Sequence, residues 1–284
     1  MRKFEDLHLG EEAFGGLSAG IVGTVIGFPL DLVKTRMQTG QAQGGILSTA
    51  SHVVRSEGIL ALYKGIAPPL ISLSIVNTFG FTSYSFFRDR YGGKDGWDVN
   101  NALAGMSGSP MLGIITTIEN LLKTQMQMDN VTQKRFTSSW HCTTTLVKEH
   151  GFSVLYTGHV VNTTREAAFM GAYFFTYEGL RSILMQHLAA PTAVPVAGGL
   201  AGAFAWAFSF PLDCIRAGVQ GRNLNAGIKK GAIRVFTDLM KTKGFLGLYS
   251  GVGPTIARAF LVSGSRFSAY EGALWLLRGG RDNR

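Results

Sequence analysis

The sequence predicts an all-α membrane protein with six transmembrane helices in three pseudo-symmetric repeats. One motif, Pro-x-Asp-x-x-Lys or a variant of it, recurs around Lys34, Lys123 and Arg216, which lie 89 and 93 residues apart. A period near 90 indicates repeated supersecondary units that cannot stand alone. Charged residues make up 16% of the chain, against about 25% in soluble proteins. This composition favours membrane helices over two soluble domains.

The first repeat begins with an apolar, Gly-rich stretch over residues 12–38. At ~1.5 Å per residue a helix of this length spans about 40 Å, enough to cross a ~30 Å hydrocarbon core with tilt. Pro29 lies inside the stretch and predicts a kink there. A short amphipathic helix is expected over 47–58, and a second apolar span over 68–90.

The same plan returns twice, so three units of span, short surface helix and span give six crossings with both termini on one side. We expect one transmembrane domain over 1–284, with repeats at 10–93, 98–188 and 192–280. The expected later elements are first spans at 99–127 and 194–221, short helices at 138–151 and 231–244, and second spans at 159–185 and 251–278.

The composition also limits the class of protein. Mean hydropathy is only +0.16, which fits helices that are apolar toward lipid and polar toward an aqueous interior. The net charge is +9, but no aromatic-basic RNA-reading motif accompanies it, so we expect no nucleic-acid partner. Cys142 and Cys214 have no CxxC neighbour, which predicts neither a metal site nor a disulfide. The N-terminus lacks a signal core and an ordinary transit-peptide composition.

Ionisable residues interrupt several of the expected spans. Each such group costs about 2.5 kcal/mol or more at bilayer depth unless it pairs or faces water. Their recurrence predicts a water-filled central cavity, which is typical of a transporter. The residues concerned are Asp31, Lys34, Arg165, Glu166, Arg258 and Arg266.

The three motif copies read PLDLVKTRMQ from Pro29, IENLLKTQMQ from Ile118 and PLDCIRAGVQ from Pro211. With their downstream Tyr-x-Gly segments, they make the chain resemble the mitochondrial carrier family over essentially its whole length. The resemblance implies a six-helix bundle around a central substrate site with a gate on each side. It also implies a monomeric secondary transporter of the mitochondrial inner membrane, which is not an enzyme and holds no cofactor or metal.

In the family pattern the motif residues close the matrix gate through ion pairs. Acid and base three residues apart share a helix face, so three such helices can exchange ion pairs around an axis. The resemblance implies that Asp31 meets Lys123 and that Asp213 meets Lys34. Asn120 replaces the third acid, with Glu119 beside it, and we therefore expect Arg216 to be underpaired. Three glutamines take the positions of the family's brace beneath these pairs, namely Gln38, Gln127 and Gln220.

The opposite, cytoplasmic gate of the family is an aromatic-acid-x-x-base motif. Only the copy with Glu178 and Arg181 is complete. The copy ending at Arg88 lacks the acid, and the copy with Glu271 lacks the base. A Glu271–Arg88 pair is the remaining expectation, and it predicts a weak gate.

Three glycines precede the even-numbered spans, at Gly65, Gly158 and Gly251. Free backbone N–H groups at a helix N-terminus attract phosphate, and the resemblance implies that cardiolipin binds there. Lys64 adds charge at one of the three sites. The alternative interpretation is that each glycine simply permits a tight turn.

The substrate site implied by the resemblance centres on Arg165 and Glu166, about three turns before Tyr177. Arg258 lies in an Arg-Ala-Phe run on the last span, where Leu261 replaces the family's usual proline. Ser72 and Asn77 fall at comparable depth on the second span. We expect these five residues to bind substrate.

Their chemistry suits a zwitterion or a cation that carries a carboxylate. An arginine fork binds carboxylate bidentately, and Glu166 can meet an ammonium or quaternary nitrogen. Tyr173 or Phe174 would add cation–π contact if it faced the cavity, or would pack against lipid. Arg266 is left open between a second carboxylate contact and a gate residue.

The Arg-Glu pair resembles the ornithine-type carriers, whereas carnitine carriers show Arg-Asp. We therefore expect basic amino acids as substrates, with carnitine or acylcarnitine as the alternative. A different class also stays open, a carrier-fold scaffold that no longer transports. The degraded second motif and gate favour the scaffold, and the retained charges Arg165, Glu166 and Arg258 speak against it.

Overall fold

The computed structural model describes residues 2–42, 44–132, 135–222, 224, 231–258 and 261–262. Within these ranges the regular structure is entirely helical. The long helices are α1 (Arg2–Gln38), α3 (Ala67–Tyr91), α5 (Ser109–Thr132), α7 (His159–Leu184) and α8 (Ala190–Gln220). The shorter ones are α2 (Ile46–Glu57), α4 (Val99–Ser107), α6 (Ser139–His150) and α9 (Ala232–Lys243), with 3₁₀ turns η1 (Ile59–Tyr63), η2 (Phe152–Tyr156) and η4 (Phe245–Tyr249).

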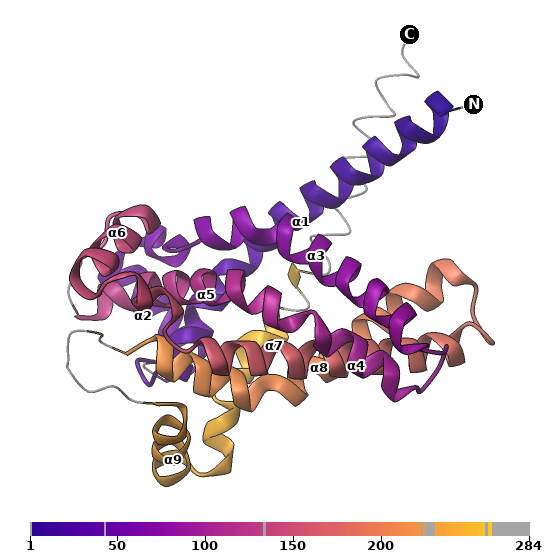
Figure 1. Cartoon of the computed structure of the whole chain (residues 1–284). Coiled ribbons are helices and arrows are strands. Elements are labelled where there is room, and N and C mark those ends of the chain that lie inside the picture. The colour runs from indigo at the N-terminus through magenta and orange to yellow at the C-terminus, as the bar shows by residue number, and fades with distance from the viewer. Residues whose placement is uncertain are drawn as a thin grey trace.

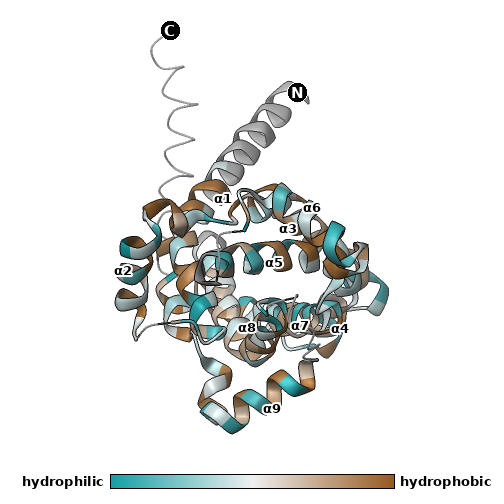
Figure 2. Cartoon of the chain, turned by 90° about the vertical axis from the view of Figure 1, so that its left-hand side faces the viewer, coloured by the Kyte–Doolittle hydropathy of each residue, from teal (hydrophilic) through white to brown (hydrophobic). Residues whose placement is uncertain are grey.

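The long helices form a bundle, and α2, α6 and α9 gather at one end of it (Figure 1). Helix α7 packs against α4, α5 and α8, and α1 contacts α3, α5 and α8. Figure 2 views the bundle from that end and shows α2, α6 and α9 at three separate positions around it. We call this the short-helix end. Residues 252–258 are also helical and begin where the sixth span is expected.

Each repeat uses the same two glycines to turn the chain at the short-helix end. The first glycine follows the short helix, at Gly58, Gly151 and Gly244. The second glycine precedes the last long helix of the repeat, at Gly65 before α3, at Gly158 before α7 and at Gly251 before the helical residues 252–258. All six have positive φ, between 64° and 89°, a region that side chains with a Cβ rarely adopt. The tight-turn interpretation therefore holds for all three predicted lipid glycines, whatever else they bind.

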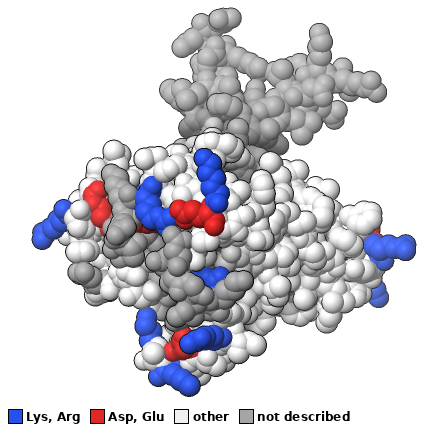
Figure 3. All heavy atoms as spheres, turned by 60° about the vertical axis from the view of Figure 1, so that its left-hand side comes forward, with Lys and Arg blue, Asp and Glu red and all other residues white. Residues whose placement is uncertain are grey.

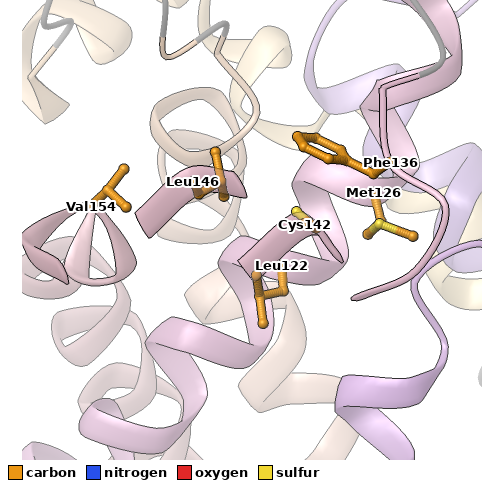
Figure 4. Packing of buried hydrophobic residues seen from close by; sticks show 6 residues of the cluster. All are labelled: Leu122, Met126, Phe136, Cys142, Leu146 and Val154. Atoms are coloured by element: carbon orange, nitrogen blue, oxygen red, sulfur yellow. The ribbon is translucent and has the colours of Figure 1, made fainter. Parts of the chain in front are cut away.

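Each short helix packs on the long helix that precedes it in the same repeat, α2 on α1, α6 on α5 and α9 on α8, through a small apolar cluster. In the second repeat Leu122 and Met126 of α5 meet Cys142 and Leu146 of α6 and Val154 of η2 (Figure 4). The first repeat uses Leu32, Val53 and Ala61, and the third uses Ile215, Val219, Val235 and Leu248. Burial raises the pKa of the Cys142 thiol to about 12, with the nearby Asp129 carboxylate acting in the same direction.

The expected span 99–127 is two helices, because the chain breaks at Gly108 between α4 and α5. Pro110 then falls in the first turn of α5, where a missing N–H costs little. Asp98 caps α4 and accepts the backbone N–H groups of Lys94 and Asn100. These bonds hold the pKa of Asp98 below its usual value.

Helix α1 continues without interruption through Pro29. By length and apolar composition, one helix of the described residues qualifies as a candidate membrane span, Thr192–Gln220. The face shown in Figure 3 is mostly uncharged, with acidic and basic residues in small separate groups. Six crossings therefore stay a prediction.

Candidate functional site

Asp31 joins three helices at the predicted gate. Lys123 of α5 places its Nζ 2.7 Å from Asp31 Oδ2, as the motif predicts. Arg258, expected in the substrate site, places its Nε 2.7 Å from Asp31 Oδ1. The side chains of Lys123 and Arg258 keep 20% and 26% exposure. This region of the interior is therefore open to water or to a solute.

Asp213 is the centre of a second ionic group and is fully buried. Lys34 Nζ of α1 lies 2.7 Å from its Oδ2, which is the other predicted pair. Gln38 donates to the same oxygen at 2.9 Å, and Arg165 Nε lies 3.7 Å from Oδ1. Several donors around one carboxylate offset the cost of burying it.

The prediction that Arg216 is underpaired is wrong. Its guanidinium donates to Asp213 Oδ1 of its own helix at 2.7 and 3.2 Å, and to Gln220 Oε1 at 3.1 Å. The i,i+3 spacing that makes the motif also allows this pair within α8. Gln220 further donates to the carbonyls of Thr117 and Thr157.

Two of the three glutamines that were expected to form a brace, Gln38 and Gln220, contact the ionic groups. Gln38 and Gln220 each hold a motif residue of the ionic groups. Gln127 is buried, but neither amide atom has a hydrogen-bond partner among the described residues. It does not brace the Lys123–Asp31 pair.

At the position where the second motif lacks its acid, neutral polar contacts replace an ion pair. Asn120 donates to Asn162 of α7 at 3.1 Å, and Asn162 donates to Thr116 and Thr117 of α5. Ser72 of α3, a predicted substrate residue, donates its hydroxyl to Glu119 Oε2 at 2.5 Å. Sequence reasoning noted Glu119 only as a neighbour of Asn120 and did not place it in the site.

Arg165 and Glu166 contact each other on α7, at 3.1 Å between Nη1 and Oε1. Both side chains are 10% exposed. The Arg165 guanidinium lies over Trp206, 5.3 Å from the ring centroid, and over Phe169 at 5.6 Å. Trp206 also lies 4.5 Å from Lys34 Nζ. The ring thus sits between a residue of the predicted substrate site and one of the predicted gate.

Trp206 was missed because a tryptophan in an apolar span matches ordinary packing. The expected aromatic partner Phe174 is in the core, stacked 3.5 Å from Tyr84. Tyr173 stacks on Phe169 and Tyr177. The structure therefore favours Trp206 and Phe169 over Phe174 as rings for a cation. Asn77 has no described side chain, and Phe260 and Arg266 lie outside the described residues.

The predicted opposite gate lies at the other end of α3 and α7. Arg88 Nη2 is 2.6 Å from Asp95 and 3.6 Å from Glu178. Glu178 also accepts from Tyr84 and from Arg181, each at 3.2 Å. Sequence reasoning did not pair Arg88 with either acid, and the expected partner Glu271 lies outside the described residues. Glu178 thus contacts Arg181 of its own motif and also Arg88 and Tyr84 of α3.

The predicted lipid glycines differ in their surroundings. Lys64, expected to add positive charge beside Gly65, forms an ion pair with Asp129 of α5. Beside Gly158 lies a pocket of about 770 Å³, lined among others by His150, His159 and Arg222. Gly158 and Gly231, the N-caps of α7 and α9, line the same pocket and leave both helix ends without a side-chain cap.

Comparison with known proteins gives one family. The family model described as "Mitochondrial carrier protein" matches residues 5–95, 97–188 and 189–280. The chain is 29% identical to the mitochondrial arginine transporter BAC2 of Arabidopsis thaliana, over 93% of this chain and 90% of the relative. It is 30% identical to solute carrier family 25 member 45 of Homo sapiens, over 94% and 98%. It is 27% identical to the succinate/fumarate mitochondrial transporter of Saccharomyces cerevisiae, over 90% and 88%.

Proposed function

The chain belongs to the mitochondrial carrier family, and from this premise we propose that it exchanges basic amino acids across the mitochondrial inner membrane by alternating access. The observation that carries the substrate class is the Arg165–Glu166 contact at 3.1 Å. It sets a carboxylate binder beside an ammonium binder inside the bundle. The similarity to an arginine transporter supports the same class.

In this proposal the substrate replaces contacts that the protein makes with itself. A substrate carboxylate would take Arg165 from Glu166, or Arg258 from Asp31, through bidentate hydrogen bonds. The released Glu166 would then accept the α-ammonium. Since Arg165 and Arg258 each also contact a motif aspartate, binding would loosen the ionic groups at the short-helix end.

The proposed matrix gate uses the same ionic groups, and the proposed cytoplasmic gate uses the contacts of Glu178. Asp31–Lys123 and Asp213–Lys34 would close the matrix side, with Gln38 and Gln220 as braces. Glu178, held by Arg88, Arg181 and Tyr84, would close the cytoplasmic side. We propose six membrane crossings and a monomer, as in the pattern that the three repeats share.

Of the three predicted lipid sites, we propose the one beside Gly158 as the site for cardiolipin. Two uncapped helix N-termini, Arg222 and two histidines line that pocket. Backbone N–H groups and a guanidinium favour phosphate. Cardiolipin, with two phosphates, suits a pocket of about 770 Å³ between two helix ends.

Carnitine is the second candidate, favoured by Trp206 beside Arg165, because a quaternary ammonium binds well over an indole ring. A dicarboxylate is a third, since one relative is a succinate/fumarate transporter. Both candidates use the arginines, and they differ in their need for Glu166.

Thermal unfolding of the purified protein across a solute library tests the proposal. A ligand at 100 times its dissociation constant stabilises by about 2.7 kcal/mol. We expect lysine, arginine or ornithine to raise the melting temperature, and norleucine not to do so. Stabilisation by succinate or carnitine alone would replace the substrate class. No shift with any solute would favour a carrier-fold scaffold.

A further inference from the structure

In the middle of the bundle, the ion pairs are unevenly distributed among the acidic residues. Among the described residues five bases lie in this region, and each has a carboxylate partner within 4 Å: Lys34, Lys123, Arg165, Arg216 and Arg258. Three acids accept all of these contacts: Asp31, Glu166 and Asp213. The fourth acid, Glu119, takes part in no ion pair with a described residue.

Glu119 is nevertheless withdrawn from bulk water. It is only partly exposed, and its described hydrogen bond is the 2.5 Å contact from the Ser72 hydroxyl. One hydroxyl donor satisfies a small part of what a carboxylate can accept. A carboxylate in such a place costs free energy unless a cation meets it. Lys123 and Arg216 act on Glu119 from beyond ion-pair distance, but they are held by Asp31 and Asp213. No described residue therefore places a cation directly on this carboxylate, and a substrate cation could do so.

Glu119 lies about one helical turn along the bundle from the proposed substrate pair Arg165 and Glu166. Asn120, its neighbour on α5, is bonded to Asn162 of α7 at 3.1 Å. Asn162 precedes Glu166 by four residues on the same helix, a rise of about 6 Å at 1.5 Å per residue. The carboxylates of Glu119 and Glu166 thus come from the facing helices α5 and α7. They are offset by about one helical turn, and Glu119 is nearer the short-helix end.

We propose that Glu119 binds the side-chain cation of a dibasic amino acid whose α-ammonium meets Glu166 and whose carboxylate meets Arg165. This assignment rests on the proposed function and adds the determinant that separates dibasic from neutral amino acids. The offset of about one helical turn is comparable with an extended lysine or arginine side chain. Ser72 fixes the Glu119 carboxylate and leaves its second oxygen for the substrate.

This assignment differs from one based on Glu166 alone. Glu166 already has Arg165 as its partner, so it offers a full negative charge only after the substrate carboxylate draws Arg165 away. Glu119 needs no such exchange. A neutral amino acid would satisfy Arg165 and Glu166 but leave Glu119 without a cation.

Arginine and citrulline test the assignment, because citrulline keeps the length and shape of arginine and replaces the guanidinium by a neutral ureido group. Initial uptake rates are measured in proteoliposomes for the wild type, Glu119→Gln and Glu119→Asp. Glu149→Gln on α6, whose carboxylate pairs with Arg135 at the surface, is the matched charge-removal control. Melting temperatures confirm that each variant is folded.

We expect wild type and Glu149→Gln to take arginine with a KM at least tenfold below that for citrulline. Glu119→Gln should reduce this ratio at least tenfold through the arginine KM while citrulline uptake continues, and Glu119→Asp should restore part of it. Should Glu119→Gln not fold, competition in the wild type decides. Equal inhibition of arginine uptake by lysine and by its neutral analogue norleucine would overturn the proposal.

Other outcomes separate the possible failures. An unchanged arginine-to-citrulline ratio in folded Glu119→Gln overturns the assignment of Glu119 and leaves the proposed function standing. An unchanged ratio together with loss of the pH dependence of uptake overturns it as well and makes Glu119 a proton site. If the wild type transports neither arginine nor lysine, the proposed function fails, and the substrate class assigned to Glu119 fails with it.

Discussion

Lys34 of α1 and Asp213 of α8 form a buried ion pair, with 2.7 Å between Nζ and Oδ2 and side-chain exposures of 10% and 0%. The pair joins the first and third repeats, as the Lys123–Asp31 pair joins the second and first. Removing one member of a buried pair costs about 3–5 kcal/mol, because the other charge is left without a partner. The pairs can therefore be tested by exchanging their charges.

The first prediction concerns Asp31 and Lys123. Reversing either charge alone places two like charges together and should abolish most transport. The double reversal Asp31→Lys with Lys123→Asp restores the pair and should retain more transport than either single variant. It should remain below wild type, because the new lysine at position 31 faces Arg258. Uptake by the double variant no better than by the worse single variant would refute the pairing.

The second prediction concerns Glu166 and substrate choice. Glu166→Gln keeps the shape and removes the charge. Uptake of basic amino acids should therefore fall by the factor that corresponds to the ~1.5–3 kcal/mol of one charge-assisted hydrogen bond. Glu166→Asp withdraws the carboxylate by one methylene and should shift preference toward carnitine. Arg258→Ala should harm all carboxylate substrates alike. Labelled lysine, ornithine and carnitine distinguish the three variants, and unchanged lysine uptake in Glu166→Gln would remove Glu166 from the site.

The third prediction concerns two helical glycines. A Cβ on Gly105 of α4 would lie 2.6 Å from the backbone oxygen of Met170 on α7, whereas a Cβ on Gly199 of α8 would meet nothing within 4 Å. Gly105→Ala should therefore force the helices apart and destabilise by about 1–3 kcal/mol. Gly199→Ala should be neutral or stabilise by up to about 1 kcal/mol. Melting temperatures of the two variants in detergent check the contrast, and equal shifts would contradict the close packing of α4 on α7.

The fourth prediction concerns Cys142 and pH. Its folded pKa of about 12 lies above the usual value of ~8.5, so the unfolded thiol loses its proton first. The free energy of unfolding should therefore lose a component as pH rises from ~8.5 toward 12, and Cys142→Ala should lack that component. At pH 8 a maleimide should label Cys142 only on unfolding, because the thiolate is the reactive form. Rapid labelling of the native protein, detected by mass spectrometry, would be inconsistent with this burial.

The repeat architecture could be predicted from the sequence, because three motifs in register predict three equivalent units. The contacts Asp31–Lys123 and Asp213–Lys34 were expected from the resemblance to the family, and the acid–base spacing alone shows only that both residues share one helix face. The break at Gly108 was missed because the 99–127 segment was read by its apolar content, although Gly-Ser-Pro interrupts it. A Cβ on Gly108 would also collide with Ser83 of α3, a long-range contact that no local pattern contains.

The local partners of the charged residues were harder to predict. Arg216 has an acid on its own helix as near as any on another, so the loss of the acid at Asn120 does not leave it unpaired. Glu119 meets Ser72 because α3 packs against α5, and the rotation of α5 that turns Glu119 toward α3 depends on tertiary packing. Trp206 of α8 lies between Lys34 of α1 and Arg165 of α7, so its position depends on how these three helices pack. Such contacts depend on how the helices are rotated, which the motif spacing does not specify.

The most direct test of the central claim is exchange transport by the purified wild-type protein. Proteoliposomes loaded with unlabelled lysine are supplied outside with labelled arginine, and protein-free liposomes serve as the control. The proposed function predicts saturable uptake that depends on the internal lysine and that external ornithine inhibits. Uptake no greater than in protein-free liposomes, for arginine, lysine and ornithine alike, would contradict it.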